Sequence, residues 1–229
     1  GSVLAQHEAD LDFANTNIKS QQSLQEGAKY FVNYCLGCHS AKYVRYNRLA
    51  EDLGLTEQQL VDNLMFTGER PFDTMAIAMR PEDATRWFGN DPPDLSLVAR
   101  SRGKDWLYTF LRGFYVDPTR PTGANNIVLP GAAMPPVLWE LQGLQRAKFS
   151  VDAEHGGVEV FEGFESIQPG TMTEEEFDNA VLHLVNFLDY IGEPIKRERQ
   201  ALGIRVIGFL LVFLLIAYML KKEIWKDVH

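Results

Sequence analysis

Residues 35–39 read Cys35-Leu36-Gly37-Cys38-His39, and this run decides how the rest of the chain is interpreted. It contains the only two cysteines in a sequence of 229 residues. Two thiols on neighbouring turns can each form a thioether with a vinyl group of haem, and the histidine that follows can direct a ring nitrogen at the iron. The run therefore predicts one covalently bound c-type haem, attached through Cys35 and Cys38, with His39 as a ligand of the iron.

A C-x-x-C run has two other common uses, as a redox dithiol and as half of a zinc site. A dithiol needs no adjoining histidine. A structural zinc site needs two further Cys or His ligands at fixed spacing, and none follows nearby in the sequence. The adjoining His39 therefore favours haem attachment over both.

Charge is distributed unevenly along the chain. The whole sequence has a formal net charge of −9, but residues 196–229 contain seven basic and three acidic side chains, so residues 1–195 carry −13. The phosphates of nucleic acid would repel so acidic a domain. The charge favours a basic protein partner, or it simply keeps the surface well solvated.

The C-terminal segment is apolar over a long stretch. Residues 206–220 read VIGFLLVFLLIAYML, and extending back to residue 201 gives about 20 residues, enough for a helix to cross a hydrocarbon core of roughly 30 Å. Basic residues flank both ends, which favours a membrane span over a buried core helix. We therefore expect a haem domain in residues 1–195 and a membrane anchor in residues 196–229, with the span at about 201–220.

The orientation of this anchor follows from the haem. Four basic residues precede the apolar stretch and three follow it, so the positive-inside rule does not decide. Covalent haem is normally attached outside the cytoplasm. We therefore expect a periplasmic haem domain, or its mitochondrial equivalent, a single membrane pass and a cytoplasmic C-terminus.

The remaining sequence reads as helices joined by long irregular loops. Capping boxes predict helix starts at residues 23–26, 56–59 and 173–176. The last of these helices has one apolar face and should end at Gly192, and a short helix is expected over residues 105–113. Residues 114–136 and 150–172 are rich in Pro, Gly and Asn and predict loops, in which residues 158–161 could form a strand or one arm of a hairpin.

The iron needs a sixth ligand unless that position stays open for a small molecule. Thioether sulfur suits ferrous iron and raises the reduction potential, as in cytochromes c with His/Met ligation. Met134 lies in the small, rigid segment Pro-Gly-Ala-Ala-Met-Pro-Pro at 130–136, which would let the backbone approach the haem ring. Met65, Met75 and Met79 lie on or near apolar helical stretches, where core packing is expected. The alternative for Met134 is that it fills a gap beneath a loop.

A second proline-bounded loop covers residues 90–94, Asn-Asp-Pro-Pro-Asp. Such a loop can present a carbonyl group to the second nitrogen of the axial imidazole. Arg100 and Arg102 follow it. Because they are two residues apart they point differently, so one could face inward and pair with a haem propionate. Solvent exposure is the alternative for either arginine.

Together these motifs resemble the cytochrome c1 family, the haem-bearing subunits of the cytochrome bc1 complex (quinol:cytochrome c oxidoreductase). The resemblance rests on CLGCHS at 35–40, PPDLSLVARSR at 92–102, the GAAMPP loop and the capped helix that leads into one C-terminal anchor. The run LAEDLGLTEQQ is similar to bacterial members. Gly27 and Phe31 resemble the glycine–aromatic pair with which the first helix of a cytochrome c fold packs on the last.

The resemblance implies a mainly α, cytochrome c-like haem domain with long loops and one C-terminal transmembrane helix in the bacterial inner membrane. The residues that it assigns to the haem are the thioether donors Cys35 and Cys38, the axial ligands His39 and Met134, Arg102 near a propionate, and a carbonyl of Pro92 or Pro93 near His39. The segment between Arg102 and the following helix is shorter than in many relatives. The match of Trp106 to their haem-packing aromatic residue therefore stays open.

The implied function is relay of single electrons in a respiratory or photosynthetic chain. A Rieske iron–sulfur protein would reduce the haem, and a basic cytochrome c or equivalent acceptor would take the electron, so the chain itself performs no bond chemistry. Cytochrome b and the lipid bilayer are further implied partners of a dimeric complex, and no nucleic acid is expected. A haem-based gas sensor or peroxidase would instead need an open sixth position, and a stand-alone anchored cytochrome c would lack these partners.

Overall fold

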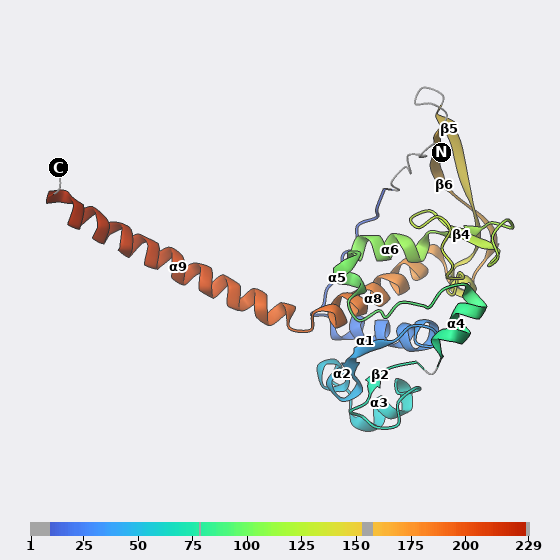
Figure 1. The fold of residues 1–229 in the computed structure, drawn as a ribbon, viewed down its shortest axis with the longest axis horizontal. Helices are drawn as coiled ribbons and strands as arrows, with labels where there is room; N and C mark the ends of the chain where they lie inside the picture. The colour runs from blue at the N-terminus through green and yellow to red at the C-terminus, as the bar shows by residue number, and fades with distance from the viewer. Residues whose placement is uncertain (1–9, 78, 153–157, 228–229) are drawn as a thin grey trace. The chain divides into compact units, whose positions relative to one another are not determined.

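A computed structural model of the chain describes residues 10–77, 79–152 and 158–227, and Figure 1 shows its ribbon. The chain divides into two compact units, Gly1–Gly192 and Glu193–His229. The first contains the C-x-x-C-H run, and the second consists mainly of one long helix. The predicted fold class, mainly α with long loops and a long apolar C-terminal helix, is confirmed.

Helices supply most of the regular structure of the first unit. In chain order they are α1 (Gln21–Tyr30), a short π-helix (Phe31–Cys35), α2 (Tyr46–Leu53), α3 (Glu57–Asn63), α4 (Pro81–Phe88), α5 (Val98–Ser101), α6 (Lys104–Arg112), α7 (Trp139–Gln142) and α8 (Glu174–Gly192). The strands form antiparallel pairs, namely β1 (Ala41–Arg45) with β2 (Thr74–Met75), β3 (Phe114–Val116) with β4 (Ala124–Asn126), and β5 (Gly143–Asp152) with β6 (Val158–Pro169).

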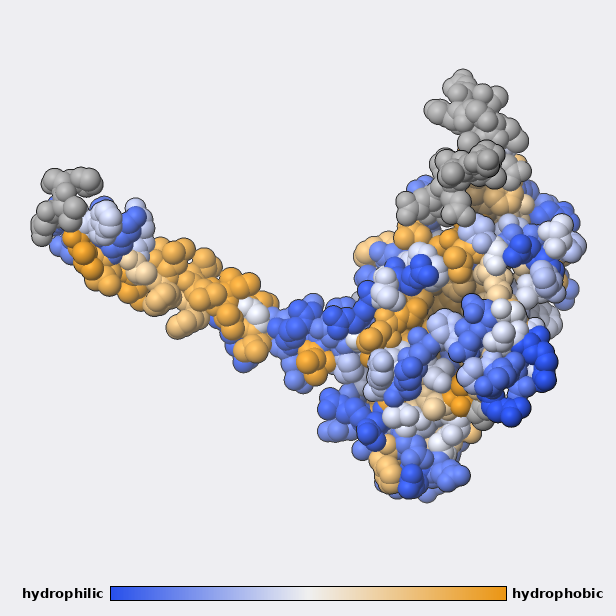
Figure 2. All heavy atoms as spheres, in the orientation of Figure 1, coloured by the Kyte–Doolittle hydropathy of each residue, from blue (hydrophilic) through white to orange (hydrophobic). Residues whose placement is uncertain are grey.

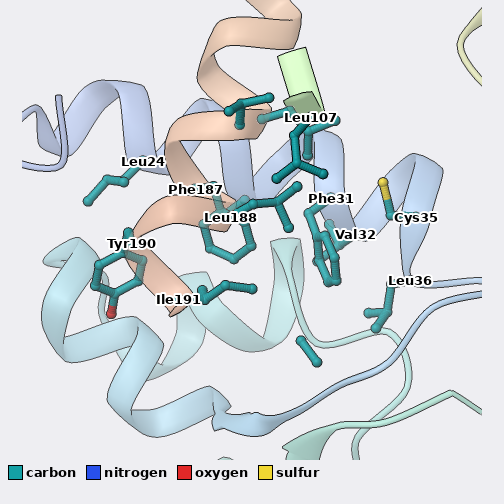
Figure 3. Packing of buried hydrophobic residues seen from close by; sticks show 14 of the residues in the cluster. Leu24, Phe31, Val32, Cys35, Leu36, Leu107, Phe187, Leu188, Tyr190 and Ile191 are labelled. Atoms are coloured by element: carbon teal, nitrogen blue, oxygen red, sulfur yellow. The ribbon is translucent and has the colours of Figure 1, made fainter. Parts of the chain in front are cut away.

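The core is built where α1 and α8 pack against each other (Figure 1). Gly27 permits this close approach, because a β-carbon there would lie 2.1 Å from the backbone oxygen of His183. One turn later Phe31 is fully buried, and its ring centroid lies 5.4 Å from that of Phe187. Figure 3 shows both rings among the buried side chains between the two helices. The predicted packing of the first helix on the last through Gly27 and Phe31 is confirmed.

Two of the three predicted helix starts are confirmed, and one is wrong. The hydroxyls of Thr56 and Thr173 each accept a hydrogen bond from the backbone N–H three residues later. The side-chain oxygens of Gln59 and Glu176 in turn accept from the backbone N–H groups of the two threonines, as in a capping box. The first helix is instead capped by Ser20, whose hydroxyl accepts from the N–H of Ser23. The Ser23 hydroxyl lies 2.9 Å from Nδ1 of His183, so it contacts α8 and does not cap its own helix.

The prediction of an irregular loop over residues 150–172 is wrong. Most of this segment belongs to the antiparallel hairpin of β5 and β6, and the strand suggested at residues 158–161 is the start of β6. The pairing contains register shifts between Leu144 and Gln145 and between Lys148 and Phe149. Each bulge breaks the alternation of side chains between the two faces, so the pattern that signals a strand is interrupted.

The second unit contains α9 (Lys196–Ile224), followed by a short 3-10 turn (Trp225–Asp227). Its segment Glu198–Ile224 is long and apolar enough to cross a membrane, and the most apolar stretch of 18 residues within it has a mean hydropathy of 2.4. Figure 2 shows apolar side chains around the middle of this helix and hydrophilic ones towards both ends. The predicted span at about 201–220 lies inside this segment.

Candidate functional site

The C-x-x-C-H run forms a tight turn at the end of the first helix. α1 passes directly into the π-helix Phe31–Cys35, a local widening that is frequent at functional sites. The carbonyl oxygen of Cys35 then accepts hydrogen bonds from the backbone N–H groups of Cys38, at 3.0 Å, and of His39, at 2.8 Å. This turn places both cysteines and the imidazole in the wall of one cavity.

A backbone carbonyl orients the imidazole of His39. Nδ1 of this ring lies 2.8 Å from the carbonyl oxygen of Pro93. Because a carbonyl oxygen can only accept, Nδ1 carries the proton, and Nε2 keeps the lone pair that a metal ion needs. Burial lowers the pKa of His39, and this effect outweighs the opposing effects of the Pro93 hydrogen bond and the Asp94 charge. The ring is therefore neutral at pH 7, the form in which imidazole binds metals.

The loop that carries this carbonyl is fixed to the segment after the C-x-x-C-H run. The backbone N–H of Leu95 donates to the carbonyl oxygen of Ser40 at 2.7 Å. The carboxylate of Asp94 accepts from the backbone N–H of Lys42 at 2.9 Å. The two segments are thus joined directly after His39 and Pro93, so the hydrogen bond of the imidazole does not depend on a free loop.

The cavity has a volume of about 350 Å³ and mainly apolar walls. They are contributed by the end of the first helix, α5, α6, α8 and the loops around residues 90–95 and 129–137. The aliphatic and Phe side chains in these walls include Leu95, Val98, Leu107, Phe110, Leu111, Leu129, Val137, Leu184 and Leu188. An apolar cavity with a few convergent polar groups is the usual form of a cofactor site.

The structure brings all six sequence-predicted residues to this cavity: Cys35, Cys38, His39, Pro93, Arg102 and Met134. Both Arg100 and Arg102 are exposed, but it is Arg102 that lines the cavity. Its guanidinium carbon lies 5.2 Å from the ring centroid of Trp106, which stacks on Phe110 at 4.8 Å. Trp106, whose role the sequence left open, is therefore part of the same wall.

Other methionines pack elsewhere. Met75 is fully buried in the core, and Met65 packs against the same core. The prediction of core packing is confirmed for these two. Met75 lies in strand β2, where it pairs with Ala41 of β1. Met79 is half-buried.

Burial makes Cys35 an unreactive thiol. This residue is 6% exposed, and burial, together with the neighbouring Cys38, raises the pKa of its thiol to about 12. Redox dithiols depend on a lowered thiol pKa in an electropositive, accessible site. The environment of Cys35 therefore argues against the dithiol interpretation and leaves haem attachment as the better one.

Several residues of the cavity wall carry no sign in the sequence that they belong to a site. Among them are Tyr34, Phe110, Leu184 and Leu188. The sequence does indicate that Leu184 and Leu188 are buried, because they are one turn apart on the apolar face of α8. That periodicity predicts burial but does not say whether the buried side meets another helix or a cofactor.

These residues fit an iron porphyrin. The site offers two thiols on one turn, a neutral imidazole with a free Nε2, a thioether sulfur, a guanidinium at the rim and apolar walls. The small side chains of Ala132 and Ala133 precede the sulfur of Met134 and leave room beside it. These are the groups by which proteins hold c-type haem and tune its potential.

The comparisons with known proteins agree with this site. The chain matches the Cytochrome C1 family over residues 15–145 and 162–228. It is 49% identical over 219 residues to cytochrome c1 of Allochromatium vinosum, covering 96% of this chain and 90% of that protein. It is 46% identical over 222 residues to a Nitrosomonas europaea protein named ammonia monooxygenase gamma subunit, covering 97% and 90%.

A third relative is much longer than this chain. The chain is 26% identical over 251 residues to a Bradyrhizobium diazoefficiens protein named cytochrome b/c1, covering 90% of this chain and 33% of that protein. The family match covers most of the sequence, and the identity to a bacterial cytochrome c1 extends over nearly all of it. The chain therefore belongs to the cytochrome c1 family, the haem-containing electron-transfer subunits of the bc1 complex.

Proposed function

We propose that this chain relays single electrons from a Rieske iron–sulfur protein to a cytochrome c acceptor within quinol:cytochrome c oxidoreductase. The observation that carries the proposal is the arrangement of Cys35, Cys38, His39 and Met134 around one apolar cavity in a chain of the cytochrome c1 family. On this proposal the chain is an electron carrier, and the bond chemistry of quinol oxidation takes place in other subunits.

The first helix and its turn would hold the cofactor. The sulfur atoms of Cys35 and Cys38 would form thioethers, and Nε2 of His39 would bind the iron. The hydrogen bond from Nδ1 to Pro93 fixes the plane of the imidazole and makes Nε2 a stronger donor. When bound, haem supplies reversible one-electron chemistry at its iron.

Met134 is the proposed sixth ligand. Its side chain is half-buried at the cavity. A thioether donor favours ferrous iron and so raises the reduction potential, and apolar walls that exclude water also tune it. With His39 and Met134 both as ligands, the iron would have no open position for a substrate. This distinguishes an electron carrier from a gas sensor or a peroxidase.

Arg102 is the proposed partner of a haem propionate. It stands at the exposed rim of the cavity, and Trp106 supports the face of its guanidinium. A planar guanidinium that is already oriented by stacking loses less conformational freedom when it binds a carboxylate. The charge-assisted hydrogen bonds would offset the cost of placing a propionate beside apolar walls.

We place the haem domain on the periplasmic side of a bacterial inner membrane, with α9 as its anchor. The segment Glu198–Ile224 is long enough to span the bilayer. Tyr218 and Trp225 suit the membrane–water interface, and Lys221 and Lys222 follow the apolar stretch. The residues from Lys221 onward would then lie in the cytoplasm.

Extraction of the chain with a mild detergent tests the proposed complex. A tagged chain is expected to copurify with a multi-span cytochrome b and a Rieske iron–sulfur protein, and the relative named cytochrome b/c1 supports the first of these partners. The name of the Nitrosomonas europaea relative points to a different complex as the alternative. Recovery of the haem-loaded chain alone, or with subunits of another complex, would contradict the proposal.

The electron acceptor is expected to bind through the acidic surface, so salt should slow its reduction. Residues 1–195 carry a charge of −13, and such a field attracts a basic cytochrome c and raises the association rate. At about 0.15 M salt the Debye length falls to about 8 Å, and we expect the rate to drop about tenfold from its low-salt value.

Stopped-flow reduction of a basic cytochrome c by the full-length chain in a non-ionic detergent measures this rate. An acidic cytochrome c is the control, and its reduction should become faster as salt is added. A rate that does not depend on salt for the basic acceptor would show that the acidic surface has no role in steering.

A further inference from the structure

Asn126, the last residue of β4, is a buried polar residue that joins a helix to the loop before Met134. Its side chain has no exposed surface. Nδ2 donates to the carbonyl oxygen of Phe110 in α6 at 2.8 Å, and Oδ1 accepts from the backbone N–H groups of Val128 at 2.9 Å and Leu129 at 3.2 Å. Both ends of the amide are used, which offsets the cost of burying it.

Asn125 holds the same loop further along. Its Oδ1 accepts from the backbone N–H of Gly131 at 2.8 Å, and its Nδ2 donates to the carboxylate of Asp117 at 3.0 Å. That carboxylate is itself fixed by the N–H and hydroxyl of Thr119. The two asparagines, which we name the asparagine clamp, therefore bind the loop backbone at residues 128, 129 and 131.

The loop turns sharply directly after this clamp. Gly131 has a φ of +83°, in the region that favours glycine, and a β-carbon there would lie 3.0 Å from Nη2 of Arg120. The backbone N–H of Ala132 donates to the carbonyl oxygen of Leu129 at 3.1 Å. Met134 follows and is succeeded by two prolines, whose φ angles are restricted. The clamp thus fixes one end of a short, stiff segment that carries the sulfur.

We propose that Asn125 and Asn126 are positioning residues for the axial methionine, and that they determine how often the Met134 sulfur leaves the haem iron. The inference rests on the proposed ligation by Met134. Neither of the two side chains lines the cavity. They act through the backbone of the loop. Asn126 connects this backbone to α6, a helix whose Leu107, Phe110 and Leu111 line the same cavity, and Asn125 connects it to Asp117.

Breaking the asparagine clamp should therefore let an added ligand compete more effectively with Met134 for the iron. An added ligand such as imidazole binds only when the methionine has left, so its observed affinity increases with the fraction of open loop. Loss of a buried hydrogen bond changes such an equilibrium by roughly tenfold. We therefore expect imidazole to bind ferric haem about tenfold more tightly when the clamp is broken.

The test uses the full-length, haem-loaded chain in detergent and the variants Asn126→Ala and Asn125→Asp. Imidazole affinity and the long-wavelength absorbance band of methionine-ligated ferric haem are measured. Both variants should bind imidazole about tenfold more tightly and show a weaker band. Asn125→Asp places a second carboxylate against Asp117, so the double variant with Asp117→Asn restores the hydrogen bond with donor and acceptor exchanged. Wild-type affinity should return in it.

A matched control separates positioning from general stability. Asn186 on α8 is 1% exposed, and its Nδ2 donates to the carbonyl oxygen of Asn17 and the hydroxyl of Ser23. Asn186→Ala should lower the unfolding temperature and leave imidazole affinity unchanged. Equal imidazole affinity in the control and in both clamp variants would overturn the inference.

The test still decides if one variant does not fold or if Met134 is not a ligand. If Asn126→Ala does not fold, Asn125→Asp and its double variant decide the question, because Asn125 is only half-buried. If the wild-type chain lacks the methionine band, or Met134→Leu keeps it, the proposed ligation fails and the inference fails with it. A normal band in the wild type with unchanged clamp variants overturns the inference alone.

Discussion

Replacement of both Cys35 and Cys38 by serine is expected to remove all covalently bound haem and to leave the first unit close to unfolding. Serine forms no thioether with a vinyl group. A cavity of about 350 Å³ left empty would cost about 8 kcal/mol at about 24 cal/mol per Å³ if none of it collapsed. This is comparable with the whole stability of a typical domain. Haem staining of a denaturing gel measures the attachment, and thermal unfolding followed by circular dichroism measures the stability.

The double cysteine variant is compared with the two single cysteine variants and with a substitution at Asn33. Each single cysteine variant leaves one possible thioether, so reduced haem content and a smaller loss of stability are expected. Asn33→Ser changes an exposed residue in the same π-helix and should leave haem staining normal. Normal staining of the double variant would contradict attachment at these residues.

The parts of the fold that the sequence predicts are those that depend on neighbouring residues. The turn after Cys35 and the capping boxes at Thr56 and Thr173 each form within a few residues, so their signals are local. The pairing of Gly27 with the last helix is a long-range contact. It was predicted only because the resemblance to cytochrome c folds supplied it.

The parts that the sequence did not predict depend on contacts between distant residues. Ser20 and Ser23 are equally suitable caps by type, and the choice depends on His183, 160 residues beyond Ser23. Asn126 looks like any loop asparagine until its amide is seen to reach Phe110, 16 residues earlier. Register shifts in the β5–β6 hairpin interrupt the alternating side-chain pattern by which a strand is predicted. In each case the decisive partner lies outside any short window of sequence.

The second large effect is expected at the proposed axial methionine. Met134→Leu should keep covalent haem and lower the reduction potential by on the order of 0.1 V, because the soft donor that favours ferrous iron is lost. Leucine has nearly the same volume, so the cavity wall should stay intact. Redox titration of the full-length chain in detergent measures the potential, and haem staining confirms that attachment is unchanged.

Met75→Leu is the matched control for this experiment. Met75 is fully buried in the core, so both substitutions replace a methionine sulfur in an apolar setting with a branched hydrocarbon. A change in packing alone would move the unfolding temperature in either variant, but only loss of an iron ligand lowers the potential by on the order of 0.1 V. A wild-type potential in Met134→Leu, together with a fall in Met75→Leu or Met79→Leu, would show that the ligand assignment is wrong.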